Sequence, residues 1–536
     1  MPKDHKCTEA AMVPASETRP RISVAILALD EARDLSATID CIDRIADEII
    51  VGELRFSETS PEKNHPRATS TLCIPWQHDF SAARNACLEA ATGDWIICLD
   101  AGEVLTAEAV AEVRSFVDLG VHAQNVYRLL VRSTATDNGE AAGVQIAQHR
   151  LLPNRAGLHF TGPVRESLET SIAACRLESK QLHIVITQPV NEGAGAIKLK
   201  TARRNLRVCE QSLAEARTDP RLWLARGEAF ADLGEWEQAE QAFTQARGFA
   251  AEDSAELLEA FYGELSAKDR DPSLQESQLN LCIDALKQFP VDVQLLCTMG
   301  HYLHRQQRID LATRAYQTAV RHGKIHPVSW HLTDIAELAT ICLSISLELE
   351  DRAEEARGVL EDALLEQPAS SRLRHQLIDL HVRHGRRKEA IEQVGRFPTD
   401  WPHRDALANA VRGACLANMQ NWTNAEAYLQ TAFDAGCRDV LCLRWLLLTH
   451  AALEHFDAAQ EILELWRGKE PKNPEVQKLT ASLLTRKFSQ TAQAVAAGSV
   501  TTLPPHFPVS SGSEAAEREA NPRSEATPCS EPEETG

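Results

Sequence analysis

Residues 79–105 read DFSAARNACLEAATGDWIICLDAGEVL, a helix signal followed by a turn and a buried strand. Asp79 is a typical N-cap residue, because its carboxylate can accept hydrogen bonds from the free N–H groups of the first helical turn. Residues 95–99 form a continuous apolar run that ends on two acids, Asp100 and Glu103. Ligands of open α/β sheets bind beyond the carboxyl ends of the strands, so we expect these acids to face a polar ligand.

The flanking sequence continues this alternation of strands and helices. Upstream, a helix is expected from about residue 33, and apolar runs predict strands at residues 21–29, 48–51 and 71–74. Downstream, strands are expected at residues 125–132, 145–151 and 182–186. This order is typical of an α/β domain with a mostly parallel sheet. Neither G-x-G-x-x-G after the first strand nor G-x-x-x-x-G-K-[ST] occurs, so a dinucleotide or P-loop site has no support.

Composition narrows the class of protein. At 536 residues the chain exceeds what one core usually supports, so we expect two or more domains. A formal net charge of -21 argues against nucleic-acid binding, because no basic excess is present to attract phosphate. The fourteen cysteines are scattered and predict neither a zinc site nor a disulfide framework. The N-terminus is polar and no run of about 18 apolar residues occurs, which predicts a cytoplasmic protein without a transmembrane segment.

The second half of the chain repeats itself. One pattern of Gly, Ala and larger apolar residues recurs at identical offsets in three places: Gly227, Phe230, Ala239, Phe243 and Ala246; Gly300, Leu303, Ala312, Tyr316 and Ala319; Gly413, Leu416, Ala425, Leu429 and Ala432. The period of 34 or 35 residues, seen again at Ala356, Ala390, Ala425 and Ala459, is that of the tetratricopeptide repeat (TPR). The small residues mark where the two helices of a hairpin approach closely. About six or seven stacked hairpins are therefore expected, with a concave surface for a protein partner.

These patterns predict four segments. They are a disordered N-terminus at residues 1–20, an α/β domain at 21–200, a helical repeat domain at 201–487 and a disordered acidic tail rich in Ser, Pro and Glu at 488–536. Residues 252–276 and 322–349 break the repeat period, and each needs an extra helix or a longer connection.

The α/β segment closely resembles the family 2 inverting glycosyltransferases of the GT-A fold. Members read D-F-S-x-A-R-N, T-G-D-W and L-D-A-D-E, and this chain has the corresponding residues at 79–85, 92–95 and 99–103. The resemblance covers residues 21–204 and implies a nucleotide-diphospho-sugar transferase domain, which in one branch of the family is followed by TPR repeats. It further implies a nucleotide-sugar donor and a protein, lipid or glycan acceptor, with the repeats recruiting the acceptor or a protein partner.

The resemblance also implies a role for each matching residue. In a single displacement, Glu166 takes a proton from the acceptor as general base, while Asp100 with Glu103 holds a divalent metal, Mg²⁺ or Mn²⁺, on the diphosphate. The residues expected to bind the nucleotide part of the donor are Glu31, Glu53, Arg84, Asn85 and Asp100.

Three departures from the family pattern leave a second hypothesis open. Gly102 replaces the second acid of the metal motif, the bulky pair Arg55-Phe56 replaces small residues expected near the nucleobase, and Arg165 replaces the His before Glu166. The alternative is a glycosyltransferase-like domain that has lost its metal site and acts with its repeats as an interaction scaffold. In that case Asp100 and Glu166 are solvated acids, and Arg84 with Asn85 satisfies helix and loop carbonyls.

Overall fold

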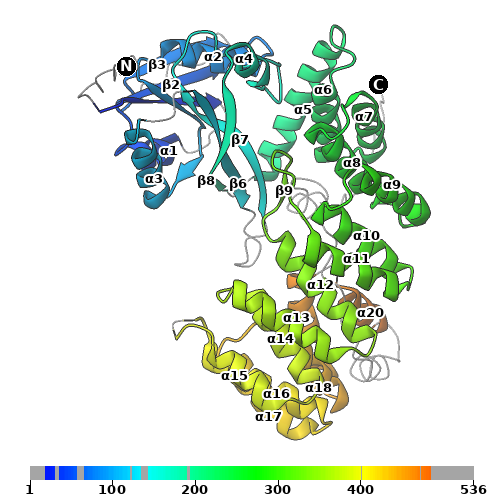
Figure 1. The fold of residues 1–536 in the computed structure, drawn as a ribbon. Coiled ribbons are helices and arrows are strands. Elements are labelled where there is room, and N and C mark those ends of the chain that lie inside the picture. Colours follow the sequence, from blue (N-terminus) through cyan, green and yellow to red (C-terminus); the bar gives the residue numbers. More distant parts are fainter. Residues whose placement is uncertain are drawn as a thin grey trace, which may run out of the picture. The chain divides into compact units, whose positions relative to one another are not determined.

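The strands of the N-terminal part form one mixed sheet (Figure 1). The computed structural model describes residues 19–29, 35–56, 65–120, 124–134, 143–189, 194–399, 401–470 and 473–483. The strands are β1 (Ile22–Leu29), β2 (Glu48–Arg55), β3 (Ser70–Pro75), β4 (Trp95–Asp100), β5 (Val104–Leu105), β6 (Asn125–Thr134), β7 (Gly143–Pro153) and β8 (Glu178–Pro189), and their order in the sheet is β3-β2-β1-β4-β7-β6-β8-β5. The pairs β1–β2, β2–β3, β1–β4 and β6–β8 are parallel, whereas β4–β7 and β5–β8 are antiparallel.

Helices cover both faces of this sheet (Figure 1). On one face, α1 (Leu35–Ile42) and α3 (Ala107–Asp118) share a buried cluster with Val24 and Ile26 of β1. On the other face, α2 (Phe80–Ala90) and α4 (Glu169–Ala174) pack with Ala25. Successive side chains of a strand point to opposite faces, so a strand covered on both sides is largely apolar, as β1 is apart from the buried Ser23. The predicted α/β class with a mostly parallel sheet is confirmed.

The stretch at residues 79–105 folds as its sequence predicts. It forms α2 and then β4, and Asp79 caps the helix by accepting a hydrogen bond from the Ala82 N–H at 3.1 Å. Leu27 of β1 lies opposite Asp100 in parallel register, so the carboxyl ends of these two strands meet at one edge.

The chain divides into two compact units, Met1–Thr134 with Gln145–Arg226, and Ala135–Val144 with Gly227–Gly536. The predicted boundary at residue 200 falls inside α5 (Ala194–Leu213), and the observed division falls inside α6 (Pro220–Asp232). The reason is a buried apolar cluster of the first unit, in which Val208, Leu213 and Leu222 of these helices pack with Val164. Of the predicted terminal segments at residues 1–20 and 488–536, all but residues 19 and 20 lie outside the described residues.

The second unit is built of TPR-like helical hairpins. After α7 (Trp236–Phe249), six hairpins follow in the described residues: α8 (Ala255–Lys268) with α9 (Gln275–Gln288), α10 (Val293–Arg305) with α11 (Ile309–His322), α12 (Ile335–Leu349) with α13 (Ala353–Glu366), α14 (Ser371–Arg383) with α15 (Arg387–Gly395), α16 (Arg404–Asn418) with α17 (Trp422–Asp434), and α18 (Val440–Ala452) with α19 (Phe456–Lys469). A final helix, α20 (Pro474–Leu483), comes after them. No described helix has the length and apolarity needed to cross a membrane.

Contacts inside the hairpins confirm the interpretation of the small residues. A Cβ atom placed on Gly300 would lie 2.5 Å from Cε1 of Tyr316, and one placed on Gly413 would lie 2.6 Å from Cγ of Leu429. Each glycine is therefore required because the facing helix lies against its backbone.

The repeat period also shows in the turns between helices. A residue with positive φ stands at corresponding places: Gln307 (60°), Asp351 (60°), Gly385 (68°), Gln420 (60°) and Glu454 (64°). The last four are 34 or 35 residues apart. The sequence breaks the repeat period at residues 252–276 and 322–349. The first of these ranges contains α8 and a short 3-10 helix (Pro272–Leu274). The second contains an irregular connection with the short strand β9 (His331–Leu332), followed by α12.

Candidate functional site

A cavity of about 280 Å³ lies in the first unit where β1 and β4 end. Its polar lining comes from five different elements or loops and consists of Arg84, Asp100, Glu166, Gln188, Arg204 and Asn205. Apolar residues of the strand ends and of α2 line the rest, among them Leu27, Leu29 and Phe80. Three of the residues predicted from sequence, Arg84, Asp100 and Glu166, thus meet in one cavity at the expected edge of the sheet.

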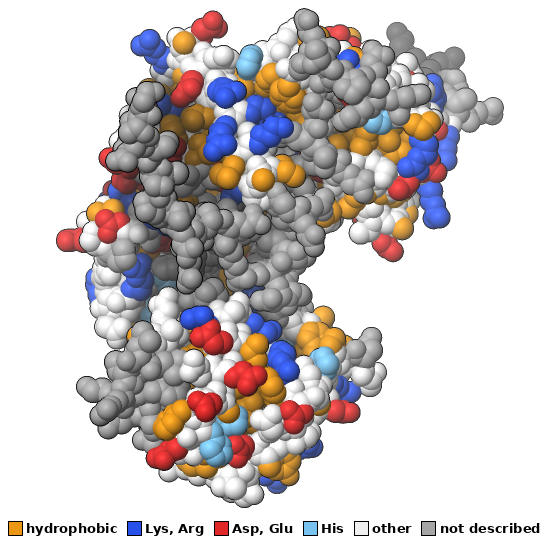
Figure 2. Space-filling model, turned by 180° about the vertical axis from the view of Figure 1, so that it is seen from behind, with side chains coloured by type: hydrophobic (Ala, Val, Ile, Leu, Met, Phe, Trp, Pro, Cys, Tyr) orange, Lys and Arg blue, Asp and Glu red, His pale blue; other side chains and the backbone are white. Residues whose placement is uncertain are grey.

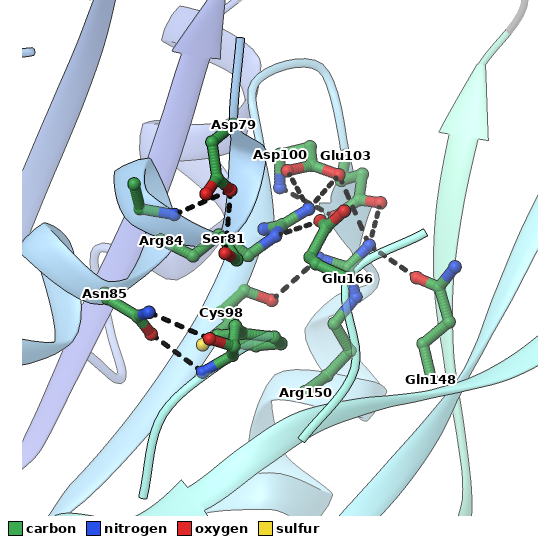
Figure 3. Close-up of polar contacts among 12 residues, drawn as sticks. Asp79, Ser81, Arg84, Asn85, Cys98, Asp100, Glu103, Gln148, Arg150 and Glu166 are labelled. Carbon is green, nitrogen blue, oxygen red and sulfur yellow. Dashed lines mark hydrogen bonds and ion pairs between the residues drawn. The ribbon is translucent and has the colours of Figure 1, made fainter. Parts of the chain in front are cut away.

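Arg84 connects the two acids of the cavity (Figure 3). Its Nε lies 2.5 Å from Oε1 of Glu166, and its Nη2 lies 2.9 Å from Oδ1 of Asp100. The Arg84 side chain is 13% exposed. Burial lowers the pKa of Arg84, but the attraction of Asp100 and Glu166 outweighs it and raises that pKa well above its ordinary value. Arg84 therefore stays charged and holds both carboxylates in place.

Glu103 is turned away from the cavity and is 1% exposed. Its Oε1 accepts a hydrogen bond from Nη2 of Arg150 at 2.7 Å, and its Oε2 accepts one from the Asp100 N–H at 2.8 Å (Figure 3). Burial raises the pKa of Glu103 to about 7, although Arg150 acts against this. The sequence predicts that Glu103 shares a metal with Asp100, whereas the structure places it in a buried ion pair that supports the backbone of Asp100.

Gly102 has a conformational reason to be glycine. Its φ is 90°, in the region that L side chains rarely adopt, and its N–H donates a hydrogen bond to Oγ1 of Thr38 at 2.8 Å. A carboxylate side chain at this position would be strained in this backbone conformation. The missing acid of the motif is thus tied to the shape of the turn between β4 and β5.

Two other predicted residues lie outside the cavity lining. The side-chain amide of Asn85 donates to the Phe160 carbonyl at 2.9 Å and accepts from the Phe160 N–H at 2.7 Å, so it anchors the loop that leads to Glu166. Glu53 on β2 is 8% exposed and lies 2.7 Å from Nε2 of His65. Glu31 lies outside the described residues.

Sequence reasoning missed part of the site. Arg204 and Asn205 of α5 and Gln188 of β8 line the cavity, yet Arg204 and Asn205 fall beyond the predicted domain boundary. The Arg204 guanidinium lies 5.1 Å from the centre of the Phe80 ring and 5.9 Å from that of Phe56. The sequence signal that could have indicated these residues is their position on α5, where they precede the buried Val208 by one helical turn.

The role of Arg150 was also missed. Its guanidinium donates to four acceptors, namely Glu103, Gln148, the Cys98 carbonyl and Asp100, and it is 4% exposed. Arg84 and Arg150 thus supply two positive charges to a cluster of three carboxyl groups, Asp100, Glu103 and Glu166.

The donor set is compatible with one divalent cation. Asp100 lines the cavity and its side chain is 28% exposed. Mg²⁺ usually takes one or two carboxylates, and substrate phosphates and water complete its shell. Asp100 is therefore the described residue that would hold Mg²⁺ or Mn²⁺, without Glu103.

Comparisons with known proteins support the repeat region. No family model matches the chain. A TPR repeat-containing protein of Synechococcus elongatus is 28% identical over 313 residues, which covers 56% of this chain and 75% of that protein. Among solved structures, a tetratricopeptide repeat protein from Parabacteroides merdae covers 49% of this chain and 98% of its own length at 14% identity and a TM-score of 0.38. PilF of Pseudomonas aeruginosa covers 49% of this chain and 97% of its own length, at 14% identity and a TM-score of 0.27. Scores this low do not establish a common fold by themselves. The Synechococcus relative, the 34-residue period and the helical hairpins together support a TPR repeat region that follows an N-terminal mixed α/β domain.

Proposed function

We propose that the first unit is a glycosyltransferase that binds a nucleotide-diphosphate sugar in the cavity at the ends of β1 and β4 and transfers the sugar with inversion. The observation that carries this proposal is the convergence of Asp100, Glu166 and Arg84 with Arg204 in one cavity. Acid groups and guanidinium groups in a single crevice suit a ligand that carries both phosphates and a reacting sugar.

The charged residues of the cavity have different roles in the proposed reaction. Arg84 and Arg204 supply positive charge near a diphosphate, and a cation on Asp100 would neutralise further charge on the leaving group. Glu166 accepts the proton of the attacking hydroxyl group, and Arg84 orients its carboxylate. Because Arg84 pairs with both acids, it sets the spacing between the leaving-group side and the acceptor side of the reaction.

The same ion pairs support a second candidate, a scaffold without catalysis. Arg84 pairs with both Asp100 and Glu166, Arg150 pairs with Glu103, and Gly102 supplies no carboxylate. In this case the protein-binding surface of the TPR-like repeats is the functional part, and the cavity is a structural ion-pair cluster.

Calorimetric titration of the full chain with UDP- and GDP-sugars, with and without Mn²⁺, separates the two candidates. Donor binding that depends on Mn²⁺ is expected, and Asp100→Asn should remove the Mn²⁺ dependence. Glu166→Gln should keep donor binding but lower transfer or donor hydrolysis by roughly 10²–10⁴-fold. Glu169→Gln is a matched control, since Glu169 is 56% exposed in its side chain and pairs with Arg128 outside the cavity. A folded protein that binds no nucleotide sugar refutes the enzyme and leaves the scaffold.

A further inference from the structure

We propose that the second unit binds a divalent transition metal, of which Zn²⁺ is the representative, through Glu426, His450 and His455. This site is separate from the cavity of the first unit and does not depend on the proposed transferase activity. Among the described residues, these three form a group whose potential ligand atoms all lie within 4.8 Å of one another.

The repeat architecture brings the three side chains together. His450 lies in the last turns of α18, and His455 is the residue before α19. The His455 N–H donates to the His450 carbonyl at 2.8 Å across the turn, where Glu454 has a φ of 64°. Glu426 comes from α17 of the preceding hairpin, so a metal held here would tie two neighbouring repeats together.

The distances approach those of a metal site. Oε1 of Glu426 lies 2.8 Å from Nδ1 of His455 and 3.2 Å from Nδ1 of His450. Ligand bonds of 2.0–2.1 Å arranged as a tetrahedron separate two ligand atoms by about 3.3 Å. The two distances from Glu426 therefore need to open by only a few tenths of an ångström, and the ligand atoms of the two histidines lie within 4.8 Å of each other.

The burial of His450 favours metal coordination. The residue is 5% exposed, and the contact of its Nδ1 with Oε1 of Glu426 at 3.2 Å does not have the geometry of a hydrogen bond. A buried polar atom without such a bond costs free energy, which coordination would recover.

The surroundings leave room to complete the metal shell. The side chains of His455 and Glu426 are 52% and 27% exposed, so water can occupy the remaining positions. Figure 2 shows histidine and acidic side chains together at the surface of the helical region at the foot of that view. Two imidazoles and one carboxylate favour Zn²⁺ and similar ions over Mg²⁺ or Ca²⁺, which prefer oxygen ligands alone.

The test is a titration of the metal-free full chain with Zn²⁺ under reducing conditions. We expect one Zn²⁺ bound per chain and a Tm that rises with Zn²⁺ concentration. His455→Gln and Glu426→Gln should each weaken binding by at least about tenfold and remove the Tm shift. His384→Gln is a matched control, because His384 pairs with Glu348 at 3.1 Å in another repeat and should leave Zn²⁺ binding unchanged.

Co²⁺ as a second probe separates this site from the buried thiols of Cys437 and Cys442. Co²⁺ at the proposed site gives an absorption spectrum without a thiolate charge-transfer band, and Cys437→Ser leaves binding intact. The proposal is overturned if the wild-type chain binds no Zn²⁺, if His455→Gln and Glu426→Gln bind it as tightly as the wild type, or if Co²⁺ shows thiolate ligation.

Discussion

The ion pair between Glu103 and Arg150 gives the sharpest prediction about the first unit. Arg150→Met keeps much of the side-chain volume but removes the donor from Glu103, which is 1% exposed. Breaking one side of a buried ion pair typically costs about 3–5 kcal/mol, because the remaining charge stays buried without a partner. The lost hydrogen bonds to Gln148 and the Cys98 carbonyl add to this cost. We therefore expect Arg150→Met to destabilise the first unit by at least about 3 kcal/mol.

This cost should grow with pH. Burial already raises the pKa of Glu103 to about 7 with Arg150 present, and losing Arg150 raises it further. A carboxyl group whose pKa is higher in the folded than in the unfolded state binds more protons when folded, so stability falls as pH rises through the folded pKa. The deficit of Arg150→Met should thus be larger at about pH 8.5 than at about pH 5.5, where protonation relieves the buried charge.

Native-state hydrogen exchange of the β4 amides measures this effect in the first unit alone. A loss of about 3 kcal/mol speeds their exchange by roughly two orders of magnitude when global opening controls exchange. Adding Glu103→Gln to Arg150→Met should recover much of the loss at high pH. Arg67→Met, which breaks an exposed pair with Asp40, is the control and should cost no more than about 1 kcal/mol. A deficit for Arg150→Met that is equally small, or that does not change with pH, refutes this account.

Two further predictions concern the repeats and acid stability. Gly300→Ala should destabilise the second unit by about 1–3 kcal/mol, because its Cβ would lie 2.5 Å from the Tyr316 ring. Gly358→Ala in α13 meets no atom within 4 Å and should be neutral or stabilising, and equal Tm changes for the two would contradict the close-approach explanation. Burial, helped by the charge of Arg128, lowers the pKa of His149 to about 3. A histidine held neutral in the fold loses stability as pH falls below its unfolded pKa, by about 1 kcal/mol at pH 5.5. His149→Gln should therefore reduce the change of the denaturation midpoint between pH 7.5 and pH 5.5. If that pH dependence is the same as in the wild type, His149 is not its cause.

Much of the fold follows from signals that are local in the sequence. The Asp79 cap acts on a residue three positions later, and Gly300 meets Tyr316 within one repeat. Periodic burial also fixes which face of a strand or helix is apolar, so the α/β order and the 34-residue period were readable without coordinates. The domain boundary was less accurate, because α5 continues the helical pattern of the repeats while packing on Val164 of the first unit.

The partners of the charged residues depended on tertiary structure. The motif places Asp100 and Glu103 side by side as apparent equals, yet one lines the cavity and the other pairs with Arg150, 47 residues away. Arg84 reaches Glu166 across 82 residues, and Arg204 joins them from a helix that the motif does not include. Sequence alone determined which residues carry charge at the ends of β1 and β4 and where the repeats stand. The register and packing of distant elements decided which charges neutralise one another, because electrostatic attraction depends on separation in space and on burial.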